Sequence, residues 1–333
     1  MIIKSIKIIN FRNHSEFFLG CNPDTTLILG PNGCGKTSVL EAIYILTRGK
    51  SFRATDSEIL KRGEKFYRIE LEYENGEKIL ATYDGSVKTF ISLDKKSRRL
   101  PKKSKYPVVL FLPSDLNLIS SSPGRRRDYF DRVFGEFNEN YSSDVSRYEK
   151  ALKQRNELLK ADQVSNPSLF SWNLLLAKYG AEISRLRKLF IDEINTHLTK
   201  TYRSIAENSD EIEISYTSEI NNLTENAYLK KLEENFMRDS YLGHTSFGVH
   251  RDDFVFKFNQ KPADGSASRG ESRSIILALK FIESDLIYQK TAKKPLILLD
   301  DVFSELDPPR RQSLVKNFKN NQVIITSVED VLL

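Results

Sequence analysis

The stretch "LILGPNGCGKTSVL", residues 27–40, constrains the fold more than any other part of this sequence. It combines an apolar run, a glycine-rich break and the start of a helical pattern, and it contains the complete motif G-x-x-x-x-G-K-[ST]. The motif predicts a strand over residues 25–29, a loop whose backbone amides turn inward around an anion, and a helix that begins near Lys36. Such a loop is typical of proteins that bind a nucleoside triphosphate.

Each type of residue in this loop suits a phosphate group. Glycine permits positive φ and close approach of the backbone, lysine is a point charge for the β- and γ-phosphates, and a threonine hydroxyl is a suitable Mg²⁺ ligand. We therefore expect ATP and Mg²⁺ as cofactors, with Thr37 as a metal ligand. The loop residues expected to contact the nucleotide are Gly30, Pro31, Asn32, Gly33, Cys34, Gly35, Lys36, Thr37 and Ser38.

A second motif, "PLILLDD" at residues 295–301, is an apolar strand that ends in two aspartates. This is the Walker B arrangement, in which Asp300 is expected to hold the Mg²⁺ shell together with Thr37. Asp301 is then placed to orient or deprotonate the water that faces the γ-phosphate. We expect ATP hydrolysis to depend on Asp301 and Lys36 as catalytic residues.

Two further stretches resemble motifs of ABC-type ATPases. "SASRGESRS" at residues 266–274 opens an apolar helix upstream of the aspartates, and "SELD" at residues 304–307 follows them. By themselves these stretches are typical of a helix cap and a turn, but their order behind a P-loop resembles the ABC signature and D-loop. The resemblance implies that Ser268, Gly270 and Glu271 contact a nucleotide held by a second copy of the chain, so that ATP joins a homodimer.

The pattern of elements predicts an α/β fold with an ABC-type ATPase head. Residues 66–94 read as an antiparallel meander with turns at Asn75-Gly76 and Asp84-Gly85. Residues 125–208 read as about two long helices in a hairpin, a helix follows over residues 225–240, and the last third alternates strands and helices. We expect a P-loop lobe with a mixed sheet and an antiparallel β subdomain, residues 1–105 plus 245–333, and an inserted helical lobe, residues 106–244.

Composition excludes several other classes of protein. The chain has 333 residues, of which 39% are hydrophobic, and no apolar stretch approaches the length of a membrane span. Only two cysteines and four histidines occur, without the spacing of a zinc site or a disulfide framework. We expect a cytoplasmic protein with no membrane partner and no chemistry on nucleic acid itself. The net charge of +6 permits a polyanionic partner.

The order of motifs over nearly the whole chain is similar to that of the RecF family of bacterial DNA replication and repair proteins, which act with RecO and RecR at gapped DNA. The segments that carry this resemblance, besides the P-loop, are "KIINFRNH", "GKSFRATD", "VVLFLPSDLNLISSSPGRRRDYFD", "GVHRDD", "SRGESR" and "LLDDVFSELD". The resemblance implies that Arg12 and Asn13 lie near the nucleotide. It also implies an ATP-driven homodimer on duplex or gapped DNA, slow hydrolysis for release, and a role with RecO and RecR in loading a recombinase.

Alternatives remain open at this point. A transporter ATPase subunit would share the P-loop, but Thr326 or Ser327 stands where a switch histidine is expected. An SMC-like head would need a far longer coiled coil between the P-loop and the signature. A protein that only binds nucleotide as a structural ligand would not need paired aspartates. The seven cationic side chains between Lys95 and Lys105 are either a DNA contact or a solvated hairpin face.

Overall fold

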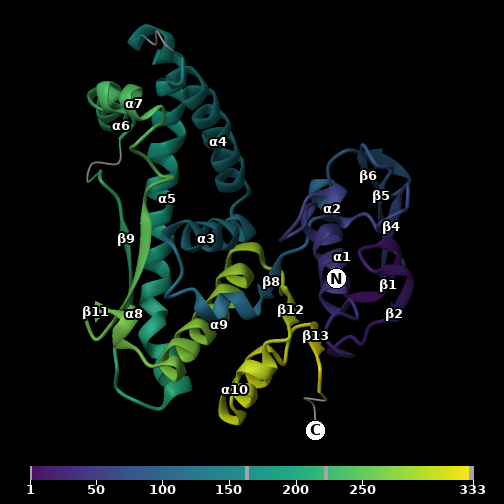
Figure 1. Cartoon of the computed structure of the whole chain (residues 1–333). Helices are drawn as coiled ribbons and strands as arrows, with labels where there is room; N and C mark the ends of the chain where they lie inside the picture. Colours follow the sequence, from purple (N-terminus) through teal and green to yellow (C-terminus); the bar gives the residue numbers. More distant parts are fainter. Residues whose placement is uncertain (1, 162–164, 221–223, 330–333) are drawn as a thin grey trace. The chain divides into compact units, whose positions relative to one another are not determined.

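The computed structural model describes residues 2–161, 165–220 and 224–329. The chain divides into two compact units (Figure 1). Unit 1 consists of Met1–Asp115 and Glu283–Leu333, so it is built from both ends of the chain, and unit 2 consists of Leu116–Ile282. None of the helices among the described residues combines the length and the apolar character needed to cross a membrane.

Unit 1 contains two sheets. The antiparallel sheet has the spatial order β2 (His14–Gly20), β1 (Ile3–Phe11), β4 (Tyr67–Tyr73), β5 (Lys78–Tyr83), β6 (Lys88–Ser92) and β7 (Lys95–Ser97). The second sheet is parallel throughout and has the order β3 (Thr25–Leu29), β13 (Val323–Ser327), β12 (Leu296–Asp300) and β8 (Val108–Phe111). The fold class expected from the sequence, an α/β ATPase head with parallel and antiparallel sheets, is confirmed.

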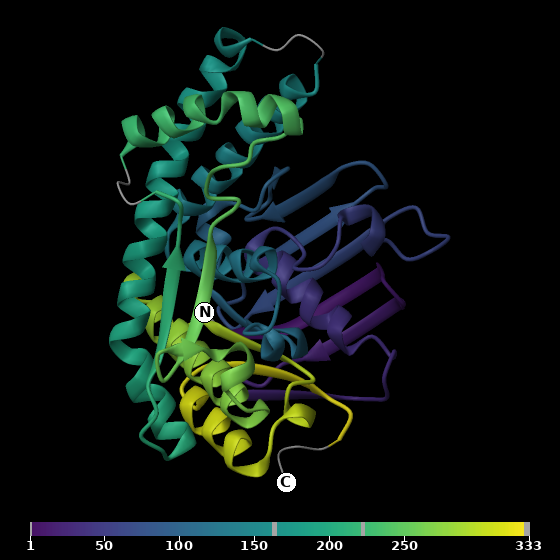
Figure 2. The same ribbon diagram turned by 60° about the vertical axis from the view of Figure 1, so that its left-hand side comes forward.

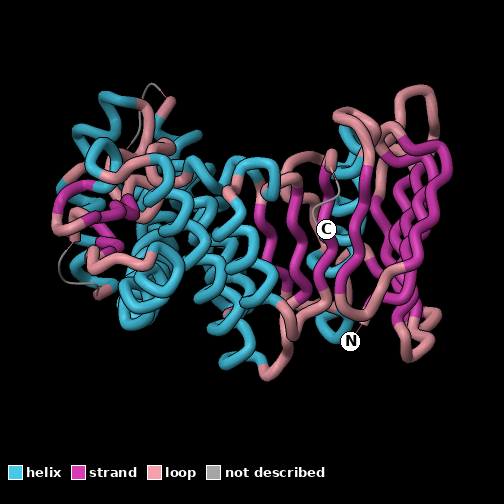
Figure 3. Tube along the Cα trace, turned by 90° about the horizontal axis from the view of Figure 1, so that it is seen from below, coloured by secondary structure: helices cyan, strands magenta, loops and turns pink. Residues whose placement is uncertain are grey.

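Helix α1 (Lys36–Arg48) forms the centre of the unit 1 core. It is apolar on nearly every side, so it contacts strands of the antiparallel sheet on one side and strands of the parallel sheet on the other. A helix between two groups of strands is visible in Figure 3. The other helices that contribute to unit 1 are α2 (Asp56–Ile59), the C-terminal part of α9 (Arg269–Thr291) and α10 (Pro308–Phe318).

The meander predicted from the sequence is the pair of hairpins β4–β5 and β5–β6. Tyr67 pairs with Tyr83 across the first hairpin, and the strands alternate buried and partly exposed residues as a half-buried sheet does. Gly76 and Gly85 have φ of 81° and 92° in the turns. This left-handed conformation favours glycine, which explains why the Asn-Gly and Asp-Gly pairs identified both turns.

Unit 2 is mainly helical. Its helices are α3 (Pro123–Phe137), α4 (Glu139–Leu159), α5 (Asn166–Ala206), α6 (Glu225–Glu234), α7 (Phe236–Leu242), the short α8 (Ala263–Ser266) and the start of α9. Its sheet has the order β11 (Lys261–Pro262), β10 (Asp253–Phe258) and β9 (Ile212–Thr217). The helices α4 and α5 pack along each other, and β9 runs beside α5 (Figure 2).

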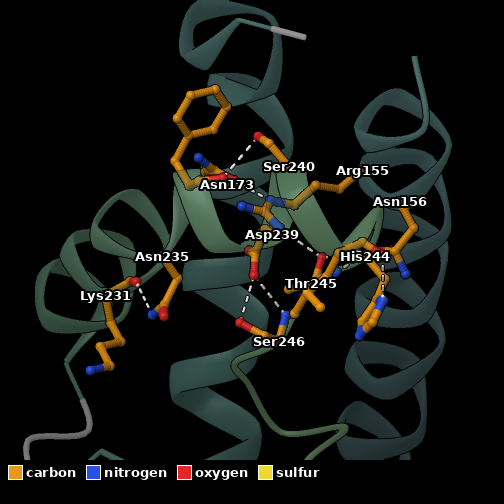
Figure 4. Close-up of polar contacts among 12 residues, drawn as sticks. Arg155, Asn156, Asn173, Lys231, Asn235, Asp239, Ser240, His244, Thr245 and Ser246 are labelled. Carbon is orange, nitrogen blue, oxygen red and sulfur yellow. Dashed lines mark hydrogen bonds and ion pairs between the residues drawn. The ribbon is translucent and has the colours of Figure 1, made fainter. Parts of the chain in front are cut away.

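A buried ion pair holds α7 against the α4–α5 hairpin (Figure 4). Arg155 of α4 is fully buried and donates to Asp239 Oδ2 of α7 at 2.7 Å, to Thr245 Oγ1 at 2.7 Å and to Asn173 Oδ1 of α5 at 2.7 Å. Asp239 Oδ1 accepts hydrogen bonds from the backbone and hydroxyl of Ser246. Because burying a charge is costly unless it is paired, this network selects one position for α7 and the loop after it.

The helical region differs from the sequence-based expectation in two places. The segment predicted as two long helices contains three among its described residues, because Asn138 ends α3 and caps α4 by accepting from Tyr141 N. The helix predicted over residues 225–240 is divided at Asn235 into α6 and α7. In both places an asparagine whose side chain bonds to nearby backbone ends the helix, which apolar periodicity does not reveal.

The boundary between the units also differs from the predicted one. Strand β8, which we expected in the helical lobe, pairs with β12 in the parallel sheet of unit 1. Strand β10, which we expected in the P-loop lobe, pairs with β9 in unit 2. Residues 106–115 therefore pack with unit 1 and residues 245–282 with unit 2. Strand partners are set by hydrogen bonds between distant segments, so local composition could not assign these two strands.

Candidate nucleotide site

The P-loop connects the carboxyl end of β3 to the first residue of α1, as its motif predicts. Gly33 and Gly35 have φ of 82° and 104°, and Gly35 is the N-cap of α1 without a side-chain cap. A Cβ atom at Gly35 would overlap the side chains of Asn13 and His14. Glycine is therefore required at this position, and the first amides of α1 remain directed toward an incoming anion.

Lys36 lies across this loop. Its Nζ donates to the carbonyl oxygens of Gly30 at 2.7 Å and Pro31 at 3.1 Å, and its side chain is buried. These neutral acceptors hold the ammonium group at the mouth of the loop. A phosphate oxygen there would be a stronger, charge-assisted partner.

Thr37 and Asp300 meet where the parallel strands end. Thr37 Oγ1 donates to Asp300 Oδ1 at 2.7 Å, with Oδ2 at 3.0 Å. Thr326, at the end of the intervening strand β13, donates from Oγ1 to the same Asp300 Oδ1 at 2.9 Å. The carboxyl ends of parallel strands lie at one edge of the sheet, so the order β3-β13-β12 brings these three residues together.

These oxygen atoms fit a magnesium ion. Mg²⁺ usually takes one or two protein oxygens and completes its octahedron with water and substrate phosphates. Thr37 Oγ1 and Asp300 Oδ1 are two such oxygens in contact with each other. Within the described residues, no group of three or more histidine, cysteine or acidic side chains could hold a metal ion.

Asp301 adopts a strained backbone conformation next to Asp300. Its φ is 51°, in the left-handed region, and its amide donates to the Thr326 carbonyl at 3.1 Å and the Thr326 hydroxyl at 3.0 Å. Its Oδ1 is buried without a hydrogen-bond partner among the described residues. Burial raises the pKa of the Asp301 carboxyl, Asp300 adds to this increase, and Lys36 opposes it. Asp301 thus retains an oxygen that can accept a proton.

A cavity of about 540 Å³ opens beside the P-loop. It is lined by Arg12, Asn13, Asn32, Gly33, Gly35, Lys36, Thr37, Ser38, Arg53, Glu58, Leu60, Arg62 and Asp301. The tight turn between β1 and β2 supplies Arg12 and Asn13, and Asn13 Nδ2 donates to the Gly33 carbonyl at 3.1 Å. The cavity therefore unites the P-loop, Asp301 and the two N-terminal residues that the family resemblance implied.

The sequence did not reveal the buried ion-pair network that holds two arginines at this cavity. Glu41 of α1 is fully buried and accepts from Arg12 at 2.9 Å, from Arg53 at 2.8 Å and from Ser51 at 2.6 Å. Burial alone would raise the pKa of Glu41, but these hydrogen bonds, from Arg12 first, lower it overall. Arg53 lies in "GKSFRATD", a segment that carried the family resemblance, but nothing in that segment distinguished Arg53 from its neighbours. Arg62, which also lines the cavity, belongs to no motif in the sequence.

The predicted signature residues lie in unit 2, at the start of α9. Ser268 N donates to Glu271 Oε2 at 2.6 Å, and Glu271 N donates to Ser268 Oγ at 3.2 Å. This reciprocal pair is a capping box, so it has a structural role in starting the helix. Ser268 is also exposed, and Gly270 follows it within the first turn.

The fold and site together define a class of protein. A P-loop and an aspartate pair at the carboxyl edge of one parallel sheet are the core of a P-loop ATPase domain. Residues 1–242 match the family described as AAA ATPase domain.

Comparison with known proteins identifies the family. The chain is 33% identical to the DNA replication and repair protein RecF of Clostridium perfringens (strain SM101), over 99% of this chain and 94% of that protein. The same protein of Clostridioides difficile is 33% identical over 99% of this chain and 92% of its own length. A solved structure described as the recombination mediator protein RecF-ATP in the RecFOR pathway has a TM-score of 0.89 at 29% identity, covering 100% of this chain and 93% of that one. The chain belongs to the RecF family of DNA replication and repair proteins.

Proposed function

We propose that this protein binds Mg-ATP in the P-loop cavity and hydrolyses it slowly. The observation that supports the proposal is the contact between Thr37 and Asp300. The next residue, Asp301, has an Oδ1 without a hydrogen-bond partner among the described residues. Thr37 and Asp300 would hold the metal ion, which neutralises charge on the phosphates when bound. The RecF-ATP structure that the chain resembles supports ATP as the nucleotide.

The residues of the cavity have different roles in ATP binding and hydrolysis. Lys36 and the first amides of α1 bind and orient the phosphates, and Arg12 and Arg53, held by Glu41, add positive charge. Asp301 acts as general base toward the attacking water. Many ABC-type ATPases have a glutamate there, and the shorter aspartate reaches less far toward that water. We therefore propose a slow reaction, suited to a switch.

A second copy of the chain completes this site in our proposal. The exposed Ser268 hydroxyl and the amides at the start of α9 form a second anion-binding helix end, together with Gly270 and Glu271. Contacts from this segment to the γ-phosphate held by the partner would make ATP the link between two protomers. Hydrolysis then removes the linking phosphate and loosens the homodimer.

DNA is the proposed partner of this dimer. The segment from Lys95 to Lys105 includes the edge strand β7 and exposes a row of cations, namely Lys95, Lys96, Arg98, Arg99, Lys102 and Lys103. Such a row suits contacts to the phosphate backbone of duplex or gapped DNA. Membership of the RecF family supports a cytoplasmic role in recombinational repair with RecO and RecR as partners, including loading of a recombinase.

One experiment tests the core of this proposal. Light scattering should show a monomer with ADP and a dimer with Mg-ATP, and phosphate release should be measurable in the same sample. A protein that binds ATP but releases no phosphate at any concentration would instead favour the structural-ligand alternative. A monomer in all nucleotide states would overturn the homodimer.

A further inference from the structure

A second cavity opens in unit 1 at the opposite edge of the parallel sheet. It measures about 620 Å³ and lies where the strands begin, whereas the P-loop lies where they end. Its walls come from the segments that precede β3, β8, β12 and β13, including Asp24, Tyr106, Pro295 and Gln322. We refer to it as the amino-edge pocket. Its volume falls in the range of small-molecule sites.

The rim of the amino-edge pocket is positively charged. Lys293 and Lys294 approach it from the loop after α9, Lys319 from the end of α10, and Asp24 from the loop before β3. Three ammonium groups against one carboxylate leave a net charge of +2. All four side chains are exposed, and none forms an ion pair with another described residue within 4.0 Å. The positive charge of the rim is therefore available to bind an anionic ligand.

The floor of the pocket contains an unused polar group. Tyr73 lines the cavity and is 1% exposed, and its hydroxyl makes no hydrogen bond with any described residue. A buried polar group without a partner is costly, and tyrosine hydroxyls usually find one when buried. Around it the floor is apolar, with Ile3 and Leu296 among the buried residues. A ligand group that reaches Tyr73 would remove this cost.

The walls are held in place before any ligand arrives. The Tyr106 hydroxyl donates to the Lys294 carbonyl at 2.9 Å, and Asn321 Nδ2 donates to the Pro295 carbonyl at 2.8 Å. Next to Asn321 in the chain, Gln322 Nε2 donates to the Ile3 carbonyl at 2.7 Å. These bonds tie both lysine-bearing loops to the sheet. Preorganisation of this kind lowers the entropy cost of binding.

We propose that the amino-edge pocket binds a small phosphate monoester with a flat aromatic group, of the nucleoside monophosphate class. A phosphate monoester carries nearly two negative charges at neutral pH, which matches the rim, and lysine suits phosphate as a point charge. The flat group would cover the aromatic and apolar floor. Duplex DNA is too wide to reach a floor that lies behind the rim, so a free small molecule is the better fit.

Titration calorimetry with AMP tests this site. The variant in which Lys293, Lys294 and Lys319 are all changed to alanine should bind AMP at least about tenfold more weakly than wild type. The control changes three exposed lysines elsewhere, Lys150, Lys188 and Lys316, to alanine and should retain wild-type affinity. Lys36→Ala should also retain it, since the P-loop is a separate site. Loss of AMP binding in Lys36→Ala, or unchanged binding in the first variant, would overturn the proposal.

Two further measurements sharpen the assignment. Tyr73→Phe should weaken AMP binding by about fivefold or more without lowering the melting temperature, because its hydroxyl bonds to nothing else described. A lower melting temperature with unchanged AMP affinity would assign Tyr73 a purely structural role and remove it from the site. Inorganic phosphate should bind more weakly than AMP. Equal affinity for phosphate, or displacement of AMP by a 5′-phosphorylated DNA duplex, would overturn the ligand class.

Discussion

Thr37 Oγ1 lies 2.7 Å from Asp300 Oδ1, although the two residues are 263 positions apart in the chain. Thr37 lies in the first turn of the helix that follows one parallel strand, and Asp300 ends another strand, with β13 between the two strands. The Thr326 hydroxyl on β13 donates to the same Asp300 Oδ1. The contact therefore depends on the strand order of the sheet, and it joins the phosphate loop to the proposed metal-binding carboxylate.

Thr37→Ala tests that contact. The variant removes one proposed metal ligand, whereas Asp300 keeps its hydrogen bond from Thr326, so the fold should survive. We expect affinity for ATP to fall about tenfold or more in Mg²⁺, which corresponds to the loss of a hydrogen bond to a charged group. In EDTA the variant and wild type should bind ATP equally. An equal loss with and without Mg²⁺ would contradict the role of Thr37 as a metal ligand.

The P-loop lysine can be tested without removing its charge. Lys36→Arg keeps the cation but replaces a compact ammonium with a broad, planar group where Nζ now bonds to the Gly30 and Pro31 carbonyls. We expect normal folding by circular dichroism and loss of ATP-stimulated DNA retention. If ATP stimulates DNA binding by this variant as it does for wild type, Lys36 is not the phosphate-binding lysine.

A pair of substitutions separates hydrolysis from dimerisation. Asp301→Asn should still bind ATP but trap the dimer, because the base is removed and the linking phosphate is kept. Ser268→Arg should bind ATP as a monomer and fail to dimerise. The double variant should behave like Ser268→Arg, since a dimer that never forms cannot be trapped. Gel filtration with ATP distinguishes these outcomes, and normal dimerisation of Ser268→Arg would contradict the composite site.

Arg53 is a residue that only the structure indicated. Arg53→Ala removes a guanidinium from the cavity wall and one of the two cations that hold Glu41. We expect affinity for ATP to fall by about tenfold through the loss of positive charge at the phosphates. Arg68→Ala, which removes an exposed arginine paired with Glu70 on β4, is the matched control. Equal ATP affinities for the two variants would remove Arg53 from the site.

His250 should make the stability of unit 2 sensitive to acid. Its Nε2 donates to the Thr245 carbonyl at 3.0 Å, so Nδ1 accepts from the Tyr148 hydroxyl at 2.8 Å and the ring is neutral. Burial lowers the pKa of His250 from its ordinary value of 6.5 to about 4. Because the folded-state pKa is depressed, the stabilising contribution is fully present above pH 6.5 and is lost as the pH falls toward 4.

The expected loss between pH 7 and pH 5 is about 2 kcal/mol in the free energy of unfolding. Denaturant unfolding of wild type and His250→Gln at both pH values measures it. Glutamine can make both hydrogen bonds but cannot titrate, so its stability should depend less on pH over this interval. His197→Gln, at an exposed position, should behave like wild type. An unchanged pH dependence in His250→Gln would show that His250 does not cause the effect.

The row of cations on β7 and the following turn gives a salt-dependent prediction. Changing Lys95, Lys96 and Lys103 to glutamine should weaken DNA binding equally for all sequences, because phosphate contacts carry no sequence information. The slope of log affinity against log salt should fall by about 0.9 for each DNA phosphate that the variant no longer neutralises. Identical slopes for variant and wild type would assign these cations to a solvated hairpin face.

Local signals in the sequence were sufficient for the parts of the fold that depend on near neighbours. The glycines and lysine of the P-loop, the Asn-Gly and Asp-Gly turns and the apolar strand before Asp300 each predicted the element that the structure contains. A turn with positive φ favours glycine at one position, and a helix that binds an anion needs free amides in its first turn. Both requirements depend on residues that are close together in the sequence, so local patterns reveal them. The sequence alone therefore determined the class of site and the family.

The tertiary structure alone decided which distant segments meet. It paired β8 with β12 and β10 with β9, against the predicted domain boundary, and it brought the hydroxyls of Thr37 and Thr326 to the same Asp300 Oδ1. It also buried Glu41 beneath Arg12 and Arg53. Apolar strands of similar composition can pair in several orders, and a charged residue in a helical pattern reads as exposed. Only the packing of the complete chain selects among these arrangements, because their free energies depend on contacts between residues far apart in sequence.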